Sequence, residues 1–75
     1  MALTLRELLE EHGVHHSALA QATGVHEITV YFWLSGRSRP RAHRLRAIAD
    51  AIGVSVDDVR RALGETERRA TAKDG

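Results

Sequence analysis

The chain has 75 residues, no cysteine, one proline and a formal net charge of +1. This length fits one domain, the lack of cysteine excludes disulfides and thiolate metal sites, and the abundance of Ala, Leu, Val and Ile favours an all-α fold of short helices on one core. We expect a soluble, cytoplasmic protein, because no apolar stretch approaches the roughly 18 residues of a membrane span and the N-terminus does not resemble a signal peptide.

The first two predicted helices have clear start and stop signals. Thr4 and Glu7 form a capping box, which predicts a helix that begins at Leu5. Leucines at i, i+3 and i+4 give this helix an apolar side, and Gly13 supplies the left-handed residue that ends it. A second helix is predicted over residues 16–23, where the same glycine-valine stop follows.

The third predicted helix, over residues 26–36, has an unusually apolar outer side. At about 100° per residue, a helix that buries Val30 turns Ile28 and Phe32 to the opposite side. Tyr31 lies beside them. This side therefore presents three large apolar or aromatic side chains to whatever binds there.

Positive charge gathers directly after this helix. Residues 37–46 hold five arginines and no acidic residue, whereas residues 1–36 hold one arginine and four glutamates. One interpretation is an ordinary solvated surface; the other is phosphate binding, which a cationic segment after a glycine-ended helix favours. On the second interpretation, Arg37, Arg39 and Arg41 form a cationic rim beside the outer side of the third helix.

Two more helices complete the predicted domain. The fourth covers residues 42–52 and has a regular inner apolar stripe. The fifth begins after a weaker capping box at Ser55 and ends at Gly64. Because the following residues lack an apolar anchor, the predicted organisation is a folded domain over residues 1–64 and a flexible tail over residues 65–75.

Apolar residues, small residues and turn residues recur at a joint spacing that is specific, although each match alone is weak. They are Leu19-Ala20, Gly24-Val25, Val30, Gly36, Pro40, Leu45, Ile48-Ala49, Ile52-Gly53-Val54 and Val59. This spacing covers nearly the whole chain and resembles the Cro and phage-repressor type of helix-turn-helix domain. The resemblance implies a compact five-helix lambda-repressor-like fold whose third helix enters the major groove of DNA, usually as a dimer on a two-fold site.

The resemblance also implies a function and its residues. The function is sequence-specific binding of double-stranded DNA by a small, repressor-like transcriptional regulator, with no cofactor. The implied phosphate contacts are His15, His16, Ser17, Arg37, Arg39 and Arg41. The implied base contacts are Glu27, Ile28, Thr29, Tyr31 and Phe32. Apolar side chains contact thymine methyl groups, so a T-rich preference is expected.

Two departures from the family pattern bear on these expectations. Many members pair a buried arginine of the first helix with a glutamate late in the third helix, where this chain has Leu9 and Leu34. An apolar pair replaces a buried ion pair without loss of stability, which supports packing between these helices. The outer side of the third helix also offers few groups for hydrogen-bonded base recognition.

A second function is consistent with that apolar side. An exposed patch of Ile28, Tyr31 and Phe32 is also what a protein-interaction module presents to a partner's groove. DNA binding weakens steeply as salt rises, whereas apolar docking does not, so salt distinguishes the two. No catalytic constellation and no metal site are expected: His12, His15 and His16 crowd together but straddle a helix end rather than sharing one face.

A weak homodimer is expected, because one helix that reads about four base pairs gives too little specificity. In the family, the partner surface often lies near the last helix and the turn before it. The candidate residues here are Val54, Val56, Val59 and Leu63. Some of these side chains must close the core, so part of the set is expected to face a partner.

Overall fold

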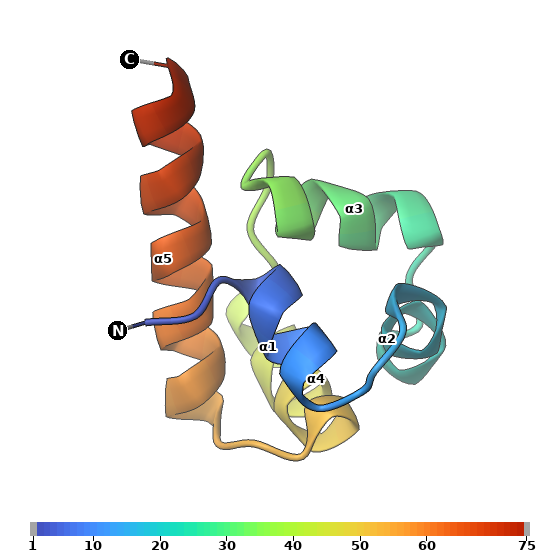
Figure 1. Ribbon diagram of the computed structural model, residues 1–75. Coiled ribbons are helices and arrows are strands. Elements are labelled where there is room, and N and C mark those ends of the chain that lie inside the picture. Colours follow the sequence, from blue (N-terminus) through green and yellow to red (C-terminus); the bar gives the residue numbers. More distant parts are fainter. Residues whose placement is uncertain (1, 75) are drawn as a thin grey trace.

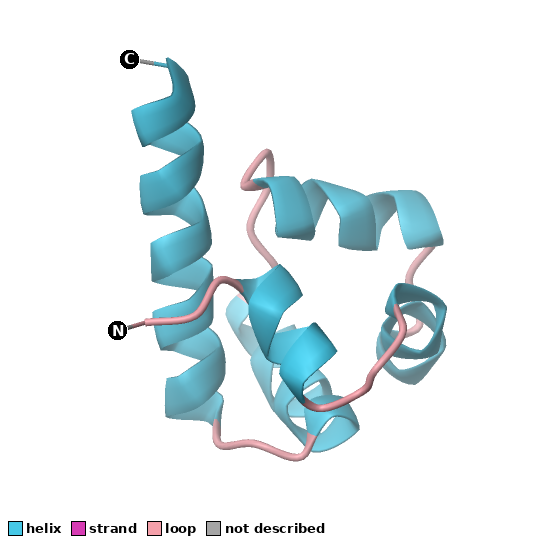
Figure 2. Ribbon diagram, viewed as in Figure 1, coloured by secondary structure: helices cyan, strands magenta, loops and turns pink. Residues whose placement is uncertain are grey.

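The computed structural model describes residues 2–74, which form a compact bundle of α-helices without a strand in this part of the chain (Figures 1 and 2). The elements are α1 (Leu5–Glu11), α2 (His16–Thr23), α3 (Glu27–Ser35), the 3₁₀ turn η1 (Ala42–Arg44), α4 (Leu45–Ile52) and α5 (Val56–Asp74). None of these helices has the length and apolar character that crossing a membrane requires. The all-α prediction is confirmed.

The N-terminus of α1 has the predicted capping box. The Glu7 backbone N–H donates to the Thr4 hydroxyl at 3.2 Å, and the Glu7 carboxylate accepts from the Thr4 backbone N–H at 2.9 Å. These two bonds satisfy backbone donors that the helix itself leaves unpaired, which explains why α1 begins at Leu5.

The inner sides predicted for the first four helices are buried together in one core. α3 packs against α2, α1 and α5, and α4 packs against α2 and α5. The buried set from these four helices is Leu5, Leu8, Leu9, Leu19, Ala20, Val30, Trp33, Leu34, Leu45, Ile48, Ala49 and Ile52. Leu9 and Leu34 are among them, so these two positions of α1 and α3 are apolar and buried.

The start of the fourth helix differs slightly from the prediction. Residues 42–44 form a 3₁₀ turn, and regular α-helix begins at Leu45. The guanidinium group of Arg44 donates to the carbonyl oxygen of Thr23 at 2.6 Å, and so ties this turn to the C-terminus of α2. A cation at the last carbonyls of a helix is favourable because it offsets the negative end of the helix dipole.

The prediction that the fifth helix ends at Gly64 is wrong. α5 continues through this glycine to Asp74, and its last turns rise past the C-terminal end of α3 (Figure 1). Thr66, in the segment predicted as a flexible tail, is 4% exposed. Charge pairs also support this segment, because Glu65 binds both Arg68 and Arg69 at helical spacing. Gly64 is therefore an internal helix residue rather than a stop.

Candidate nucleic-acid interface

α3 displays its residues as the helical spacing predicts. It lies between His26, which occupies the N-cap position without a side-chain cap bond, and Gly36, which is in the left-handed conformation with φ of 80°. Val30, Trp33 and Leu34 are buried. The remaining residues form an outer side and two flanks. One flank lies beside α2 and α1, and the other lies beside the segment that leads to α4.

The outer side of α3 is apolar and accessible. Ile28 is 57% exposed and Tyr31 is 43% exposed. Phe32 is half-buried, and the guanidinium carbon of Arg37 lies 5.5 Å from the centre of its ring. This distance fits a cation–π contact. Phe32 therefore faces outward as expected but lies under Arg37, which leaves Ile28 as the most open apolar side chain of this helix.

His16 connects the start of α2 to the flank of α3 that carries Glu27 and Tyr31, which we call the first flank. Its Nε2 lies 3.0 Å from a carboxylate oxygen of Glu27 and 3.0 Å from the hydroxyl of Tyr31. The rings of His16 and Tyr31 also pack, with centroids 4.6 Å apart. The contact with His16 uses one of the two carboxylate oxygens of Glu27, expected to contact a base, so the other oxygen can still accept a hydrogen bond from DNA.

The start of α2 is capped by a histidine. Nδ1 of His15 accepts from the backbone N–H of Ser17 at 3.3 Å, and the same nitrogen lies 2.8 Å from the Ser17 hydroxyl. One of the free N–H groups at this helix end is therefore occupied. The three residues expected to contact phosphate at this end, His15, His16 and Ser17, lie together beside the first flank of α3.

A hollow of about 540 Å³ continues the first flank toward α1 and α5. We call it the α1-side hollow. Its lining includes Arg6, Tyr31, Phe32, Ser35, Arg37 and Ala70.

A second hollow of about 540 Å³ lies on the opposite flank of α3, against the segment that leads to α4. We call it the loop-side hollow. Its lining includes Thr29, Trp33, Arg39, Arg41, His43 and Arg44. Thr29, expected on the base-reading side, is half-buried and belongs to this flank.

The three arginines expected to form one rim are divided between the two hollows. Arg37 lies in the α1-side hollow, whereas Arg39 and Arg41 lie in the loop-side hollow. The single rim is therefore corrected to cationic groups on both flanks of α3. Arg39 also pairs with Glu67 of α5 at 2.9 Å. The chain turns sharply after Gly36, where the backbone N–H of Arg37 donates to the carbonyl of Phe32, and this turn separates the arginines.

Comparison with known families agrees with this arrangement. A family model described as helix-turn-helix matches residues 5–59. The chain belongs to the Cro and phage-repressor type of helix-turn-helix domains. This is a family of DNA-binding regulatory domains and not a family of enzymes. No curated protein and no solved structure matches the chain significantly.

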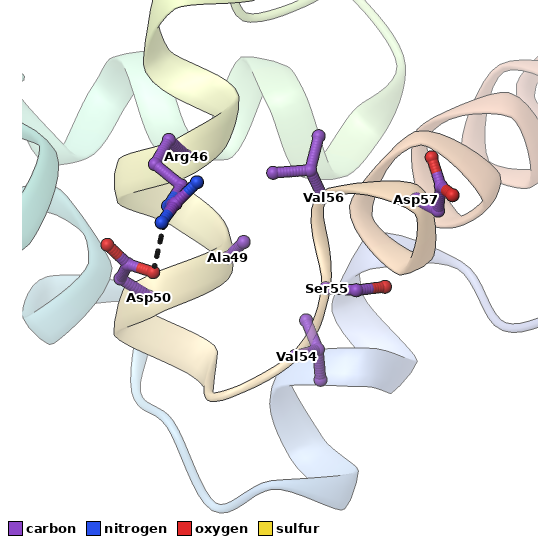
Figure 3. A pocket seen from close by; sticks show the side chains of 7 residues that line it. All are labelled: Arg46, Ala49, Asp50, Val54, Ser55, Val56 and Asp57. Atoms are coloured by element: carbon purple, nitrogen blue, oxygen red, sulfur yellow. Dashed lines mark ion pairs between the residues drawn. The ribbon is translucent and has the colours of Figure 1, made fainter.

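The turn between α4 and α5 carries the surface expected to meet a second copy of this helix-turn-helix domain. Val59 is 0% exposed and Leu63 is 2% exposed, so both belong to the core and are removed from the predicted dimer surface. Val54 and Val56 are half-buried and line a hollow of about 460 Å³. Figure 3 shows this hollow between α4 and the turn, with the Arg46–Asp50 pair at its edge.

Two arginines in the hollows beside α3, Arg6 and Arg44, were not among the candidate residues from the sequence. Arg6 is adjacent to α3 because of how α1 crosses it, a relationship that no local pattern in the sequence reveals. Arg44 reaches the carbonyl of Thr23 across the fold. Within the described residues, no group of three His, Cys, Asp or Glu side chains is arranged to hold a metal ion.

Proposed function

We propose that this helix-turn-helix domain is a sequence-specific DNA-binding regulator of the repressor type, which works in the cytoplasm and places α3 in the major groove. The observation that supports this most directly is the pair of cationic hollows on opposite flanks of α3. A helix in the major groove, which is about 12 Å wide, lies between two phosphate backbones. Positive charge on both flanks suits that position.

Phosphate contacts in this proposal come from both flanks. Arg39 and Arg41 serve one backbone, while His15, His16 and Ser17 at the start of α2 serve the other. Arg37 lies over Phe32 on the His16 side rather than beside Arg39. These contacts set the position and affinity of the protein on DNA without reading sequence.

Base recognition is assigned to the outer side of α3. Ile28 and Phe32 supply apolar contact, which suits the methyl groups of thymine. Tyr31 stands at the edge of this side, and Glu27 offers as an acceptor the carboxylate oxygen that His16 does not contact. Thr29 lies on the loop-side flank, so its hydroxyl is better placed for the edge of the groove than for its centre.

A homodimer doubles the DNA surface that is read. We assign its contact to Val54 and Val56, because the other two candidate residues are core. Arg46, Asp50 and Asp57 surround this apolar pair, so charges of both signs border it. With so few apolar side chains exposed, the dimer is weak in solution and strengthened by DNA. Light scattering with a selected DNA site tests this; a monomer with DNA bound contradicts it.

The function itself is tested by selecting DNA ligands from a random duplex pool at two salt concentrations. We expect the wild-type domain to enrich a defined motif and to bind it less tightly as salt rises. Arg41→Ala weakens binding to all sequences alike, because it removes a phosphate contact. Ile28→Ala changes the preferred sequence instead. Absence of any enriched motif, together with affinity that ignores salt, contradicts the proposal.

The second candidate function is docking of a protein partner on the same side of α3. The observation that favours it is the exposure of Ile28 and Tyr31, which are large apolar or aromatic side chains on a very small protein. A docked partner buries this patch, and its affinity survives high salt. The salt series described above therefore separates the two functions with one set of measurements.

A further inference from the structure

The α1-side hollow contains positive charge that has no partner in the described part of the chain. Arg6 reaches it from the first turn of α1, and Arg37 reaches it from the turn after α3. Neither side chain forms an ion pair with any described residue. No acidic side chain is among the residues that line this hollow. It therefore favours an anion.

The surroundings of the hollow limit this charge to a defined place. Beyond Arg6, an adjoining hollow includes Glu7 and Glu10. Glu7 is paired with Arg69 at 3.1 Å, so the charges of Glu7 and Arg69 offset each other. Glu10, one helical turn after Arg6, lines the adjoining hollow and not the α1-side hollow. The unpaired positive region thus extends from Arg37 to Arg6 and ends at the acidic side of α1.

Tyr31 connects this region to the start of α2. Its hydroxyl lies 3.0 Å from His16, while its side chain also lines the α1-side hollow. The proposed phosphate contacts at the start of α2 and the two unpaired arginines are therefore neighbours along one flank of α3. Arg39 and Arg41 lie on the opposite flank.

We propose that Arg6 and Arg37 form an additional phosphate-binding subsite, which holds the DNA backbone on the first flank of α3. The proposal depends on the proposed function and extends it to a residue of α1. A guanidinium group binds phosphate oxygens with two parallel hydrogen bonds, so each arginine holds one phosphodiester in a defined orientation. Tyr31 and Phe32 line the hollow beside both arginines, and the guanidinium carbon of Arg37 lies 5.5 Å from the centre of the Phe32 ring.

The test measures binding of a fluorescent 20-base-pair duplex of random sequence as a function of salt concentration. Each lost phosphate contact reduces the slope of log affinity against log salt by about 0.9 for duplex DNA. We expect a reduction of this size for Arg6→Ala and also for Arg6→Gln, which keeps more of the side chain. Arg6→Lys restores most of the slope. The matched control is Arg60→Ala, which removes the same charge from the first turns of α5, where Arg60 pairs with Asp57.

The outcomes test the proposed function and the additional subsite separately. A wild-type domain that binds the duplex without salt dependence contradicts the proposed function. A wild-type domain that binds with salt dependence, while Arg6→Ala and Arg6→Gln keep its slope, contradicts the additional subsite and leaves the proposed function standing. A reduced slope for Arg60→Ala equal to that of Arg6→Ala also contradicts the subsite, because the effect then follows net charge alone.

Discussion

The backbone N–H of Leu5 donates a 2.8 Å hydrogen bond to the hydroxyl of Thr66, which lies 61 positions later in the chain. That hydroxyl in turn donates to the carbonyl of Ala62 at 2.8 Å. Leu5 is the first residue of α1, and its N–H is one of the donors that a helix leaves unpaired. A side chain of α5 therefore completes the N-terminal cap of α1, and both groups are buried.

Removing this hydroxyl destabilises the fold. Thr66→Val keeps the shape of the side chain but leaves the buried N–H of Leu5 without an acceptor, which costs about 1–3 kcal/mol. Thr66→Ser retains the hydroxyl, so it loses less. Urea denaturation followed by circular dichroism measures the free energy of unfolding for each variant.

Thr71→Val is the matched control for this prediction. Thr71 lies on the same helix and donates to the carbonyl of Glu67, but it is exposed. Its replacement is expected to change the free energy of unfolding by less than about 0.5 kcal/mol, as is usual for surface sites. Equal stability of Thr66→Val and the wild-type protein would show that the bond to Leu5 contributes nothing.

Gly36 fixes how closely α5 approaches the end of α3. Its φ of 80° is in the left-handed region, and a Cβ built there would lie 2.9 Å from the Cβ of Ala70. Gly36→Ala therefore combines backbone strain of roughly 1–2 kcal/mol with overpacking of roughly 1–3 kcal/mol. We expect a loss of stability in thermal and urea denaturation that exceeds the strain alone.

Two variants separate these contributions. Gly53 has a φ of 90°, and a Cβ there meets nothing within 4 Å, so Gly53→Ala reports the strain without the clash. Ala70→Gly removes the opposing methyl group. A double-mutant cycle compares the loss of unfolding free energy caused by Gly36→Ala in the wild-type protein with the loss it causes in Ala70→Gly. We expect the loss to be smaller in Ala70→Gly. Purely additive effects would show that the clash is relieved by movement of α5.

The local signals in the sequence predicted most of the fold because they act within one or two helical turns. The capping box at Thr4 and the buried side of α3 are of this kind, and both are confirmed. The C-terminal half of α5 could not be predicted in this way. Thr66 carries no apolar signal, and its burial depends on a hydrogen bond to the other end of the chain. Gly64 resembled a helix stop because the contacts that continue α5 beyond it come from residues far away in the chain.

The candidate site was partly predictable on similar grounds. The outward direction of Ile28 follows from helical periodicity, which the sequence contains. The separation of Arg37 from Arg39 depends on the path of the turn after Gly36, which the sequence does not reveal. The approach of Arg6 to α3 depends on the packing of α1, which involves residues far apart in the chain.

Acid is expected to destabilise the contact between α1 and α5. The pKa of Glu7 is lowered by its hydrogen bond to the backbone of Thr4 and further by Arg69. The pKa of Glu65 is lowered by hydrogen bonds from Arg68 and Arg69. Since both folded-state pKa values lie below the ordinary value of 4.5, the stabilisation is present above that pH and is lost as pH falls through the folded values.

Urea denaturation at a series of pH values measures this loss. Glu65→Gln removes one of the two titrating groups, so its stability is expected to fall less steeply than that of the wild-type protein below the ordinary carboxyl pKa. Arg69→Leu keeps both carboxyl groups but removes their shared partner, so it flattens the profile as well. Parallel profiles for all three proteins would contradict the assignment.

Glu67 restrains an arginine that the proposed function needs. Its carboxylate lies 2.9 Å from the guanidinium group of Arg39, and both side chains are about half exposed. In the free protein, this pair neutralises a group that lies in the loop-side hollow. A phosphate that binds Arg39 must therefore replace Glu67, and the lost ion pair subtracts from the affinity for DNA.

Glu67→Gln is accordingly expected to strengthen binding to duplex DNA. An exposed ion pair contributes about 0.2–1 kcal/mol, so the gain is at most about fivefold in the dissociation constant at low salt. Fluorescence anisotropy measures it, with Glu11→Gln as the control, because that change removes the same charge from an exposed residue at the end of α1. Arg39→Ala should abolish the gain when combined with Glu67→Gln. If Glu11→Gln strengthens binding as much as Glu67→Gln, the effect comes from net charge and not from release of Arg39.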